Sequence, residues 1–228
     1  MARGILIRFK KYIFRLNENF VVFNPEKKNP YVKHLLSLKV CKVLHLPHKS
    51  HLKHLRLLKS LDLKGITLTD SLLNEIGMLV HLKYLIIQTK AKALPPSFSN
   101  LCNLETLMVD NAEGSYMILS PCFWSLAKLQ DVRMKCGALF EPTVLDEDLR
   151  VEFSEWQVDA EKSFPVLEKL CISGCDKLME IPDSFGDIAS LELIKVWHSP
   201  QLKESTFKIK EYVEEMTGDD KLEVEFYG

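Results

Sequence analysis

The sequence predicts an α/β leucine-rich-repeat solenoid, in which a curved parallel β-sheet is backed by short outer helices or 3₁₀ turns. Three observations predict this fold: a leucine motif that recurs along the 228 residues, a spacing between copies close to one solenoid turn, and proline-containing segments ahead of several copies. We expect roughly seven irregular repeats followed by a C-terminal cap, because the open end of a stack of repeats needs shielding.

The repeated motif places an apolar residue at positions i, i+3, i+6 and i+8. The last two positions alternate as in a β-strand, so both point inward while the residue between them faces solvent. One turn of chain cannot bury its own leucines, so neighbouring turns stack around a shared core. The matches are Leu38, Cys41, Leu44 and Leu46; Leu55, Leu58, Leu61 and Leu63; Leu79, Leu82, Leu85 and Ile87; Leu101, Leu104, Leu107 and Val109; Leu126, Leu129, Val132 and Met134; Phe164, Leu167, Leu170 and Ile172; and Ile188, Leu191, Ile194 and Val196.

The spacing of the copies supports the same fold. The third residues of the motif lie at positions 44, 61, 85, 107, 132, 170 and 194, so the steps are 17, 24, 22, 25, 38 and 24 residues. Four of these six steps fall within the roughly 20–29 residues of a leucine-rich repeat. The step of 17 predicts a clipped first repeat, and the step of 38 predicts one turn plus an insertion within residues 137–163.

Short helical or 3₁₀ turns are expected on the outer wall, in segments that precede three of the copies. Residues 94–100 and 181–186 each contain proline, which fits the first turn of a short helix because its missing N–H costs nothing there. Residues 73–77 precede the third copy in the same way.

The two ends differ from the repeats, so we divide the chain into three segments. Residues 1–34 are expected to form a basic N-terminal capping segment with one or two strands and a loop. Residues 35–203 hold the repeats, and residues 204–228 form the C-terminal cap.

The C-terminal cap is predicted to be a helix followed by a strand. Ser205 is the expected N-cap of the helix, and Gly218 is its expected stop. In the strand Leu222, Val224 and Phe226 alternate with charged or polar residues.

The formal net charge of −1 hides a strong polarity along the chain. Residues 1–60 carry 14 Lys and Arg against 2 Asp and Glu, a balance of +12, so the other residues carry 16 against 29, a balance of −13. The two ends should therefore attract partners of opposite charge, or each other. Because aromatic residues interleave with the basic ones, nucleic acid or acidic lipid is an alternative partner for this segment.

The sequence favours a cytoplasmic or nuclear protein. No stretch approaches the roughly 18 uncharged apolar residues of a membrane span, and the apolar run at the N-terminus is too short for a secretory signal. The six cysteines are scattered, so we expect reduced thiols rather than disulfides or a metal site. Four histidines recur every third residue, but the repeat disperses them around the coil and predicts no metal site; they are His45, His48, His51 and His54.

The solvent-facing positions of the strands share the concave wall of the arc, so they are the predicted protein-binding face. Tyr84, Ile86, Met108 and Trp197 are large and predicted to be exposed there, which is typical of contact hot spots. No catalytic motif occurs in a recognisable context, so we expect no enzyme activity. The predicted face comprises His45, Asp62, Lys64, Tyr84, Ile86, Gln88, Met108, Asp110, Arg133, Lys135, Cys171, Ser173, Lys195 and Trp197.

Several segments resemble a known family. The run LPPSFSNLCNLETLMV at residues 94–109 and the run LEKLCISGCDKLMEIPDSFGDIASLELIKV at 167–196 resemble the repeats of plant nucleotide-binding leucine-rich-repeat (NB-LRR) disease-resistance proteins. The stretch NPYVKHLLSL from Asn29 and the tail at 192–226 resemble the late-blight-resistance group of the nightshade family. The resemblance covers most of residues 20–228 and implies sensing of a pathogen effector or a guarded host protein, with a hypersensitive response as the outcome.

The resemblance also implies partners and departures. In the family a basic N-terminal repeat portion docks on the nucleotide-binding domain, and residues 1–60 are suitably placed for such docking. No G-x-x-x-x-G-K-[ST] phosphate loop occurs, so no cofactor is expected here, whereas full-length members bind ADP or ATP in a domain that this chain lacks. The repeat's Asn/Cys position is poorly kept outside Cys175, which predicts an irregular hydrogen-bonded edge and uneven curvature. A general leucine-rich-repeat scaffold or adaptor outside immunity is the alternative function.

Overall fold

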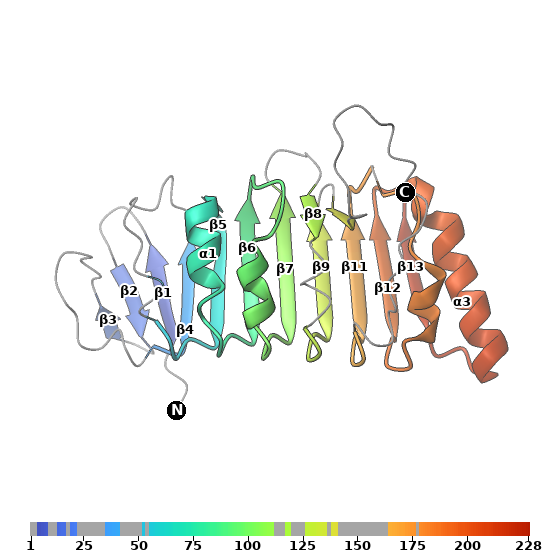
Figure 1. Ribbon diagram of the computed structural model, residues 1–228, viewed down its shortest axis with the longest axis horizontal. Helices are drawn as coiled ribbons and strands as arrows, with labels where there is room; N and C mark the ends of the chain where they lie inside the picture. Colours follow the sequence, from blue (N-terminus) through green and yellow to red (C-terminus); the bar gives the residue numbers. More distant parts are fainter. Residues whose placement is uncertain are drawn as a thin grey trace.

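The chain forms a long curved sheet with short helices on its outer side. The computed structural model describes residues 4–8, 13–16, 19–21, 35–41, 52, 55–111, 117–119, 126–135, 138–140, 164–176 and 178–228. Within these residues eleven strands form one sheet, in the order β13-β12-β11-β9-β7-β6-β5-β4-β1-β2-β3 (Figure 1). The predicted leucine-rich-repeat solenoid is confirmed.

The pairs along the sheet from β1 to β13 are all parallel. Beyond β1, the strands β2 (Ile13–Leu16) and β3 (Asn19–Val21) continue the sheet in antiparallel pairs. The parallel strands are β1 (Gly4–Arg8), β4 (Ser37–Cys41), β5 (Ser60–Leu68), β6 (Tyr84–Thr89), β7 (Thr106–Asn111), β9 (Asp131–Lys135), β11 (Lys169–Ser173), β12 (Leu193–Trp197) and β13 (Glu223–Tyr227).

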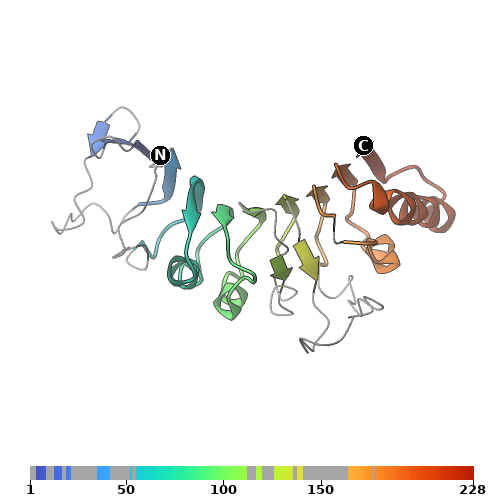
Figure 2. The ribbon, with the colours of Figure 1, turned by 90° about the horizontal axis from the view of Figure 1, so that it is seen from above.

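The motif residues form a single core between the sheet and the outer wall. All of those between Leu55 and Val196 are buried, so neighbouring turns share one apolar interior as the pattern requires. Figure 2 shows the strands of the eleven-stranded sheet along the inner side of the arc and the helices along its outer side. The short outer elements lie where they were predicted: α1 (Asp70–Ile76), η3 (Pro96–Asn100) and η5 (Asp183–Asp187), the last two being 3₁₀ helices.

Strand register corrects the prediction for the first repeat. Leu38 aligns with Leu61, and Leu61 aligns with Leu85. The first step is therefore 61 − 38 = 23 residues, and the predicted clipped repeat, based on Leu44, is wrong. The first three motif positions are three residues apart, so the third residue of one match can also serve as the first residue of another match that lies six residues later. The match in the correct frame is Val32, Leu35, Leu38 and Val40.

An irregularity interrupts strand β5. Asp62 pairs with Ile86, and Thr67 pairs with Gln88, so β5 advances five positions while β6 advances two. The three extra residues form a bulge that keeps Ile66 in the core, where its side chain is 2% exposed.

The C-terminal coil replaces a 3₁₀ turn with the longer helix α3 (Lys203–Thr217), which follows η6 (Pro200–Leu202). The predicted N-cap at Ser205 is wrong, because the helix begins earlier and Leu202 is its N-cap. The Ser205 hydroxyl accepts a hydrogen bond from the Ile181 N–H at 3.0 Å and thereby ties the helix to the preceding coil. Gly218 ends the helix as predicted, with a left-handed φ of 69° that favours glycine.

Hydrogen bonds tie the coils together at both edges of the sheet. Before the strands, one carbonyl accepts two N–H groups from the next coil; the Lys59 carbonyl, for example, accepts those of Lys83 and Tyr84 at 2.8 and 3.1 Å. At the Asn/Cys edge, the Cys175 N–H donates to the Ser199 hydroxyl at 2.9 Å. Ser199 therefore takes part in the hydrogen-bonded edge, although it departs from the Asn/Cys pattern of the repeat.

A small second sheet lies beside the main one. β8 (Met117–Leu119) pairs in parallel with β10 (Ala138–Phe140). The rest of the predicted insertion, residues 141–163, lies outside the described residues.

Candidate functional site on the concave face

Outward-facing residues align in rows across the concave face, because adjacent strands keep a common register. The leading row, nearest the strand starts, is Ser60, Tyr84, Thr106, Asp131, Lys169, Leu193 and Glu223. The central row is Lys39, Asp62, Ile86, Met108, Arg133, Cys171, Lys195 and Glu225. The trailing row is Gln88, Asp110, Lys135, Ser173, Trp197 and Tyr227.

Three predicted contact residues are buried. Asp62, Ile86 and Cys171 are 7%, 8% and 6% exposed, so the prediction that Ile86 is exposed is wrong. All three lie in the central row, where strands about 4.8 Å apart put side chains of the neighbouring strands against both flanks of a residue. These three side chains are therefore poorly accessible to a partner, whereas Lys39 and Arg133 of the same row are exposed.

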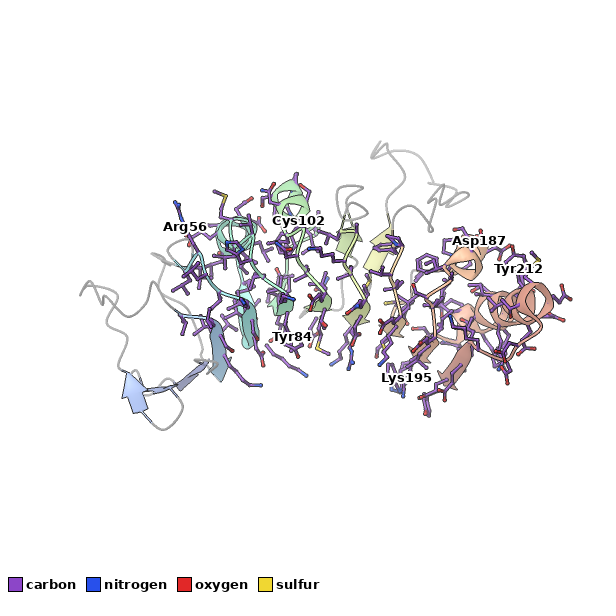
Figure 3. All side chains as sticks on the ribbon, turned by 90° about the horizontal axis from the view of Figure 1, so that it is seen from below. Arg56, Tyr84, Cys102, Asp187, Lys195 and Tyr212 are labelled. Atoms are coloured by element: carbon purple, nitrogen blue, oxygen red, sulfur yellow. The ribbon has the colours of Figure 1, made fainter. Side chains whose placement is uncertain are left out.

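An apolar and aromatic patch occupies the middle of the face. Tyr84 is 39% exposed, Ile86 lies two residues further along the same strand, and Met108 is half-buried beside Ile86. Figure 3 shows Tyr84 on the strand side of the arc, opposite Arg56 and Cys102 on the helix side. A patch of this composition can desolvate a partner's apolar side chain.

Ion pairs flank this patch on both sides. Lys39 Nζ lies 2.6 Å from Asp62 Oδ2, and Asp62 also accepts the Lys64 N–H at 3.2 Å. On the other side the Arg133 guanidinium binds Asp131 through both carboxylate oxygens, at 2.9 and 2.7 Å. These pairs orient the flanking side chains along the concave face before any partner binds.

Lys64, Gln88, Asp110, Lys135 and Ser173 complete the described part of the predicted set. Lys64 is exposed within the β5 bulge, and Lys135 Nζ lies 4.0 Å from Asp110 Oδ2 in the trailing row. Gln88, Asp110 and Ser173 are half-buried on the same row. All five lie on the concave side, but none of these contacts identifies a partner.

A second cluster lies at the C-terminal end of the face, where Figure 3 labels Lys195. The rings of Trp197 and Tyr227 stack with centroids 5.9 Å apart and an interplanar angle of 13°. Lys195 Nζ lies 5.2 Å from the Trp197 ring and 5.8 Å from the Tyr227 ring, and it also forms an ion pair with Glu225. The Tyr227 hydroxyl donates to Glu225 Oε2 at 2.9 Å, so four side chains from two strands form one network.

This network changes the proton affinities of its members. The hydrogen bond from Lys195 lowers the pKa of Glu225, and the same contact raises the pKa of Lys195. The bond to Glu225 raises the pKa of Tyr227. The first two shifts favour the charged carboxylate and ammonium at neutral pH, and the third keeps the Tyr227 phenol protonated.

Two further pKa shifts mark the central row. The hydrogen bond to Asp131 raises the pKa of Arg133 above its usual range. Burial raises the pKa of the Cys171 thiol, so this cysteine stays neutral and weakly nucleophilic at neutral pH.

The sequence interpretation missed part of this face. It included Tyr84 but not the equivalent leading-row residues, although each lies one position before the third residue of its motif. It also treated the last strand as a cap, whereas β13 pairs in parallel with β12 and adds Glu225 and Tyr227 to the face. The missed residues are Lys39, Ser60, Thr106, Asp131, Lys169, Leu193, Glu223, Glu225 and Tyr227.

Some predictions fall outside the described residues. His45 is one of them, as are His48, His51 and His54, so their placement stays a prediction. Within the described ranges, no group of three or more His, Cys, Asp or Glu residues is arranged to hold a metal ion. Across the same ranges, none of the helices has the length and apolarity to cross a bilayer.

The parallel arc and its concave rows define a leucine-rich-repeat protein, and comparison with solved structures agrees. The fold is similar to an internalin (inlF) from Listeria monocytogenes, with a TM-score of 0.58 at 15% sequence identity over 86% of this chain and 56% of that one. This likeness concerns the fold alone. No family model matches the sequence.

The relatives by sequence are plant resistance proteins, which confirms the resemblance noted in the sequence. Late blight resistance protein homolog R1B-23 of Solanum demissum is 30% identical over 67% of this chain, and homolog R1B-11 is 27% identical over 69%. Homolog R1B-16 of the same species is 34% identical over a shorter stretch, 34% of the chain. The chain spans 13% and 17% of the lengths of R1B-23 and R1B-11, so it is similar to one part of much longer proteins.

Proposed function

We propose that the chain is a protein-recognition module of plant innate immunity, which binds another protein with its concave face and catalyses no reaction. The late blight resistance homologs support the biological setting, and the leucine-rich-repeat fold supports a recognition domain rather than an enzyme.

One observation carries the proposal: an apolar patch lies between two sets of fixed ion pairs. Tyr84 and Met108 offer accessible apolar surface above the buried Ile86. The flanking Lys39–Asp62 and Arg133–Asp131 pairs are already formed, so their side chains lose little conformational freedom when a partner docks. This combination of an apolar centre and a polar rim is the usual anatomy of a protein–protein interface.

The finer proposal follows the resistance relatives. The recognised protein is a pathogen effector or a guarded host protein, the outcome is a defence response of the hypersensitive type, and the compartment is the cytoplasm. A nucleotide-binding domain that docks on the basic residues 1–60 is the proposed regulatory partner, because that segment carries a balance of +12. The chain itself is proposed to bind no cofactor.

A binding screen with matched variants tests the concave face. The chain is screened for binary interaction against secreted effectors of the late blight pathogen and against host proteins, and each binder is titrated by calorimetry. Tyr84→Ala and Met108→Ala should each weaken binding about tenfold or more, as central interface truncations do.

Met78→Ala is the matched control. Met78 is 61% exposed at the end of α1 on the convex side, so its loss should leave affinity unchanged. Circular dichroism and thermal melting must show that all three variants remain folded. If verified binders keep full affinity for both concave variants, the assignment of the central patch is wrong.

A further inference from the structure

The sheet ends at β13 with an open edge on its outer side. In the described part of the chain, no strand pairs with β13 other than β12. The Glu223 N–H donates to the Glu192 carbonyl, and the Tyr227 carbonyl accepts the His198 N–H, both toward β12. Because backbone groups alternate sides along a strand, the N–H and C=O groups of Val224 and Phe226 face away from β12. The edge therefore offers two donors and two acceptors in strand geometry.

The core side chains at this edge are incompletely covered. Val224 and Phe226 align with the fully buried Ile194 and Val196, yet both are only half-buried. Interior coils have a neighbour on each side, whereas β13 has one, so one flank of each side chain is not covered by another described strand. One further strand would bury these flanks and pair the outward backbone groups at the same time.

The charge at the edge determines which kind of strand can pair with β13. Glu223 is exposed and Glu225 is half-buried on the concave side of β13, and the exposed Asp219 precedes the strand. Asp220 is already paired with Lys210, at 2.7 Å, so the carboxylates of the strand itself set the charge of the edge. Two such edges brought together would place carboxylates opposite carboxylates, which disfavours pairing between two copies through β13. A strand with Lys or Arg at alternate positions would instead place cations opposite Glu223 and Glu225.

The chain already contains an example of that arrangement on the other side of Glu225. Lys195 of β12 pairs with Glu225 and lies over the stacked rings of Trp197 and Tyr227. Tyr227 remains 48% exposed, so its ring is accessible to a second cation from the outer side. An arginine is best suited, because its planar guanidinium can stack on the ring and bind a carboxylate together.

We propose that the outer edge of β13 binds an extended segment of a partner protein, rich in Arg or Lys at alternate positions, which adds to the sheet as a further strand. The backbone groups of Val224 and Phe226 pair with the segment, and Glu223, Glu225 and the Tyr227 ring bind its cationic side chains. This inference deepens the proposed recognition function and rests on it, but it concerns a site distinct from the patch at Tyr84 and Met108.

A synthetic peptide tests the site without knowledge of the natural partner. The probe is a short capped peptide that alternates Arg with Val and Thr, and its controls replace Arg with Glu or N-methylate the backbone. Affinity is measured by fluorescence anisotropy with the whole chain, and hydrogen exchange follows the β13 amides. The amides of Val224 and Phe226 should exchange more slowly when the Arg peptide is bound, and both control peptides should bind at least about tenfold more weakly.

Variants of the edge separate charge from backbone pairing. Glu223→Lys should weaken binding of the Arg peptide about tenfold and strengthen binding of the Glu peptide. Glu211→Lys, the same charge change on the exposed face of α3, should leave both affinities unchanged. Val224→Pro removes an outward N–H without breaking the ladder to β12, so the Arg peptide should no longer slow exchange of the remaining outward amide, that of Phe226, in a folded protein. Circular dichroism checks that fold, and Glu223→Lys keeps the test decisive if the proline variant fails to fold.

Three outcomes would overturn the inference. Unchanged affinity in Glu223→Lys would exclude the acidic edge, and loss of affinity in Tyr84→Ala would place the peptide on the central patch instead. Dimers of the wild-type chain that Val224→Pro abolishes would show that a second copy occupies the edge. None of these results depends on the binders found for the concave patch, so failure here leaves the proposed function standing.

Discussion

The interior coils and the C-terminal coil share one register but are held together differently. Leu107 in β7 and Val224 in β13 occupy equivalent positions through an unbroken series of paired strands. Leu107 is completely buried between neighbours on both sides, whereas Val224 is half-buried with a described strand on one side. The burial of a residue therefore depends on its position in the stack of coils as well as on its position in the motif.

The terminal coil compensates with polar contacts and a longer helix. The Lys208–Asp183 ion pair and the Tyr212–Asp187 hydrogen bond, with N–O and O–O distances of 2.6 and 2.9 Å, join α3 to η5. Figure 3 shows Tyr212 and Asp187 side by side on the helix side of the arc. Leucine burial, which is non-directional, stabilises the interior coils, and the end adds directed contacts that depend on pH and salt.

The largest expected difference between the two regions comes from core truncation. Leu107→Ala should lower the free energy of unfolding by about 2–5 kcal/mol, because it leaves a cavity enclosed on all sides. Val224→Ala should cost about 1 kcal/mol, because part of the site already meets solvent and can collapse. Urea denaturation followed by circular dichroism measures both. Equal losses would mean that the end of the sheet is as well packed as its middle.

The next largest difference in stability is expected between alanine substitutions at two glycines. A Cβ at Gly77 would lie 2.6 Å from Ser97 Cβ and 2.8 Å from its backbone carbon in the next coil, so Gly77→Ala should cost about 1–3 kcal/mol. A Cβ at Gly186 would clash only with the Tyr212 ring, 2.6 Å away, which can swing outward, and would make an ordinary contact with Ile209 at 3.7 Å.

Gly186→Ala should therefore cost about 1 kcal/mol or less and break the bond from Tyr212 to Asp187. The pKa of Tyr212, which that bond raises, should fall back toward its ordinary value in an ultraviolet titration. Tyr212→Phe identifies the signal in the spectrum. A larger stability loss at Gly186 than at Gly77 would contradict the contrast.

Acid should loosen the C-terminal coil before the interior. The pKa of Glu225 is lowered in the folded state, so its contribution to stability is present above its ordinary pKa and is lost as pH falls through the lowered value. The environment of Trp197 should therefore change only at a pH below the ordinary pKa of glutamate, in a transition that Glu225→Gln removes. Tryptophan fluorescence, with Trp197→Phe to assign the signal, measures it. An unchanged transition in Glu225→Gln would exclude this pair as the cause.

The smallest expected change in stability comes from an ion pair at the edge of the sheet where the strands begin. Lys83 and Glu105 form an ion pair between adjacent coils, but both side chains are substantially exposed. Lys83→Ala should change the free energy of unfolding by about 0.5 kcal/mol or less, because solvent screens such pairs. A larger loss in urea denaturation would show that this edge bears more of the fold's stability than the leucine core predicts.

Most of the fold could be predicted because the motif is repeated and its physical basis is local. The strands, their parallel order and the outer turns at α1, η3 and η5 follow from which residues must be buried. The first repeat could not be framed correctly, since Leu38 and Leu44 both fit the marker position and only pairing with Leu61 decides between them. The boundaries at 34/35 and 203/204 stay predictions.

The candidate face was predicted less completely. Alternation gave the sides of most strand residues, but it could not show that crowding by the adjacent strands buries Ile86 and Cys171. The cluster around Trp197 could not be predicted from the sequence either, because it depends on the pairing of β13, which was assigned to the cap, with β12 of the repeats. That last pairing joins residues about thirty positions apart, Lys195 and Glu225, for which no local pattern provides a signal.

The stacking of coils along one axis also determines how the molecule responds to mechanical force. Each strand is bonded only to those beside it, so tension applied between the two termini of the sheet unravels the arc from an end, coil by coil. Between β4 and β9 the register positions 38, 61, 85, 107 and 132 are 23, 24, 22 and 25 residues apart. A single-molecule stretching trace of this region should therefore show nearly equal length increments, one for each coil released.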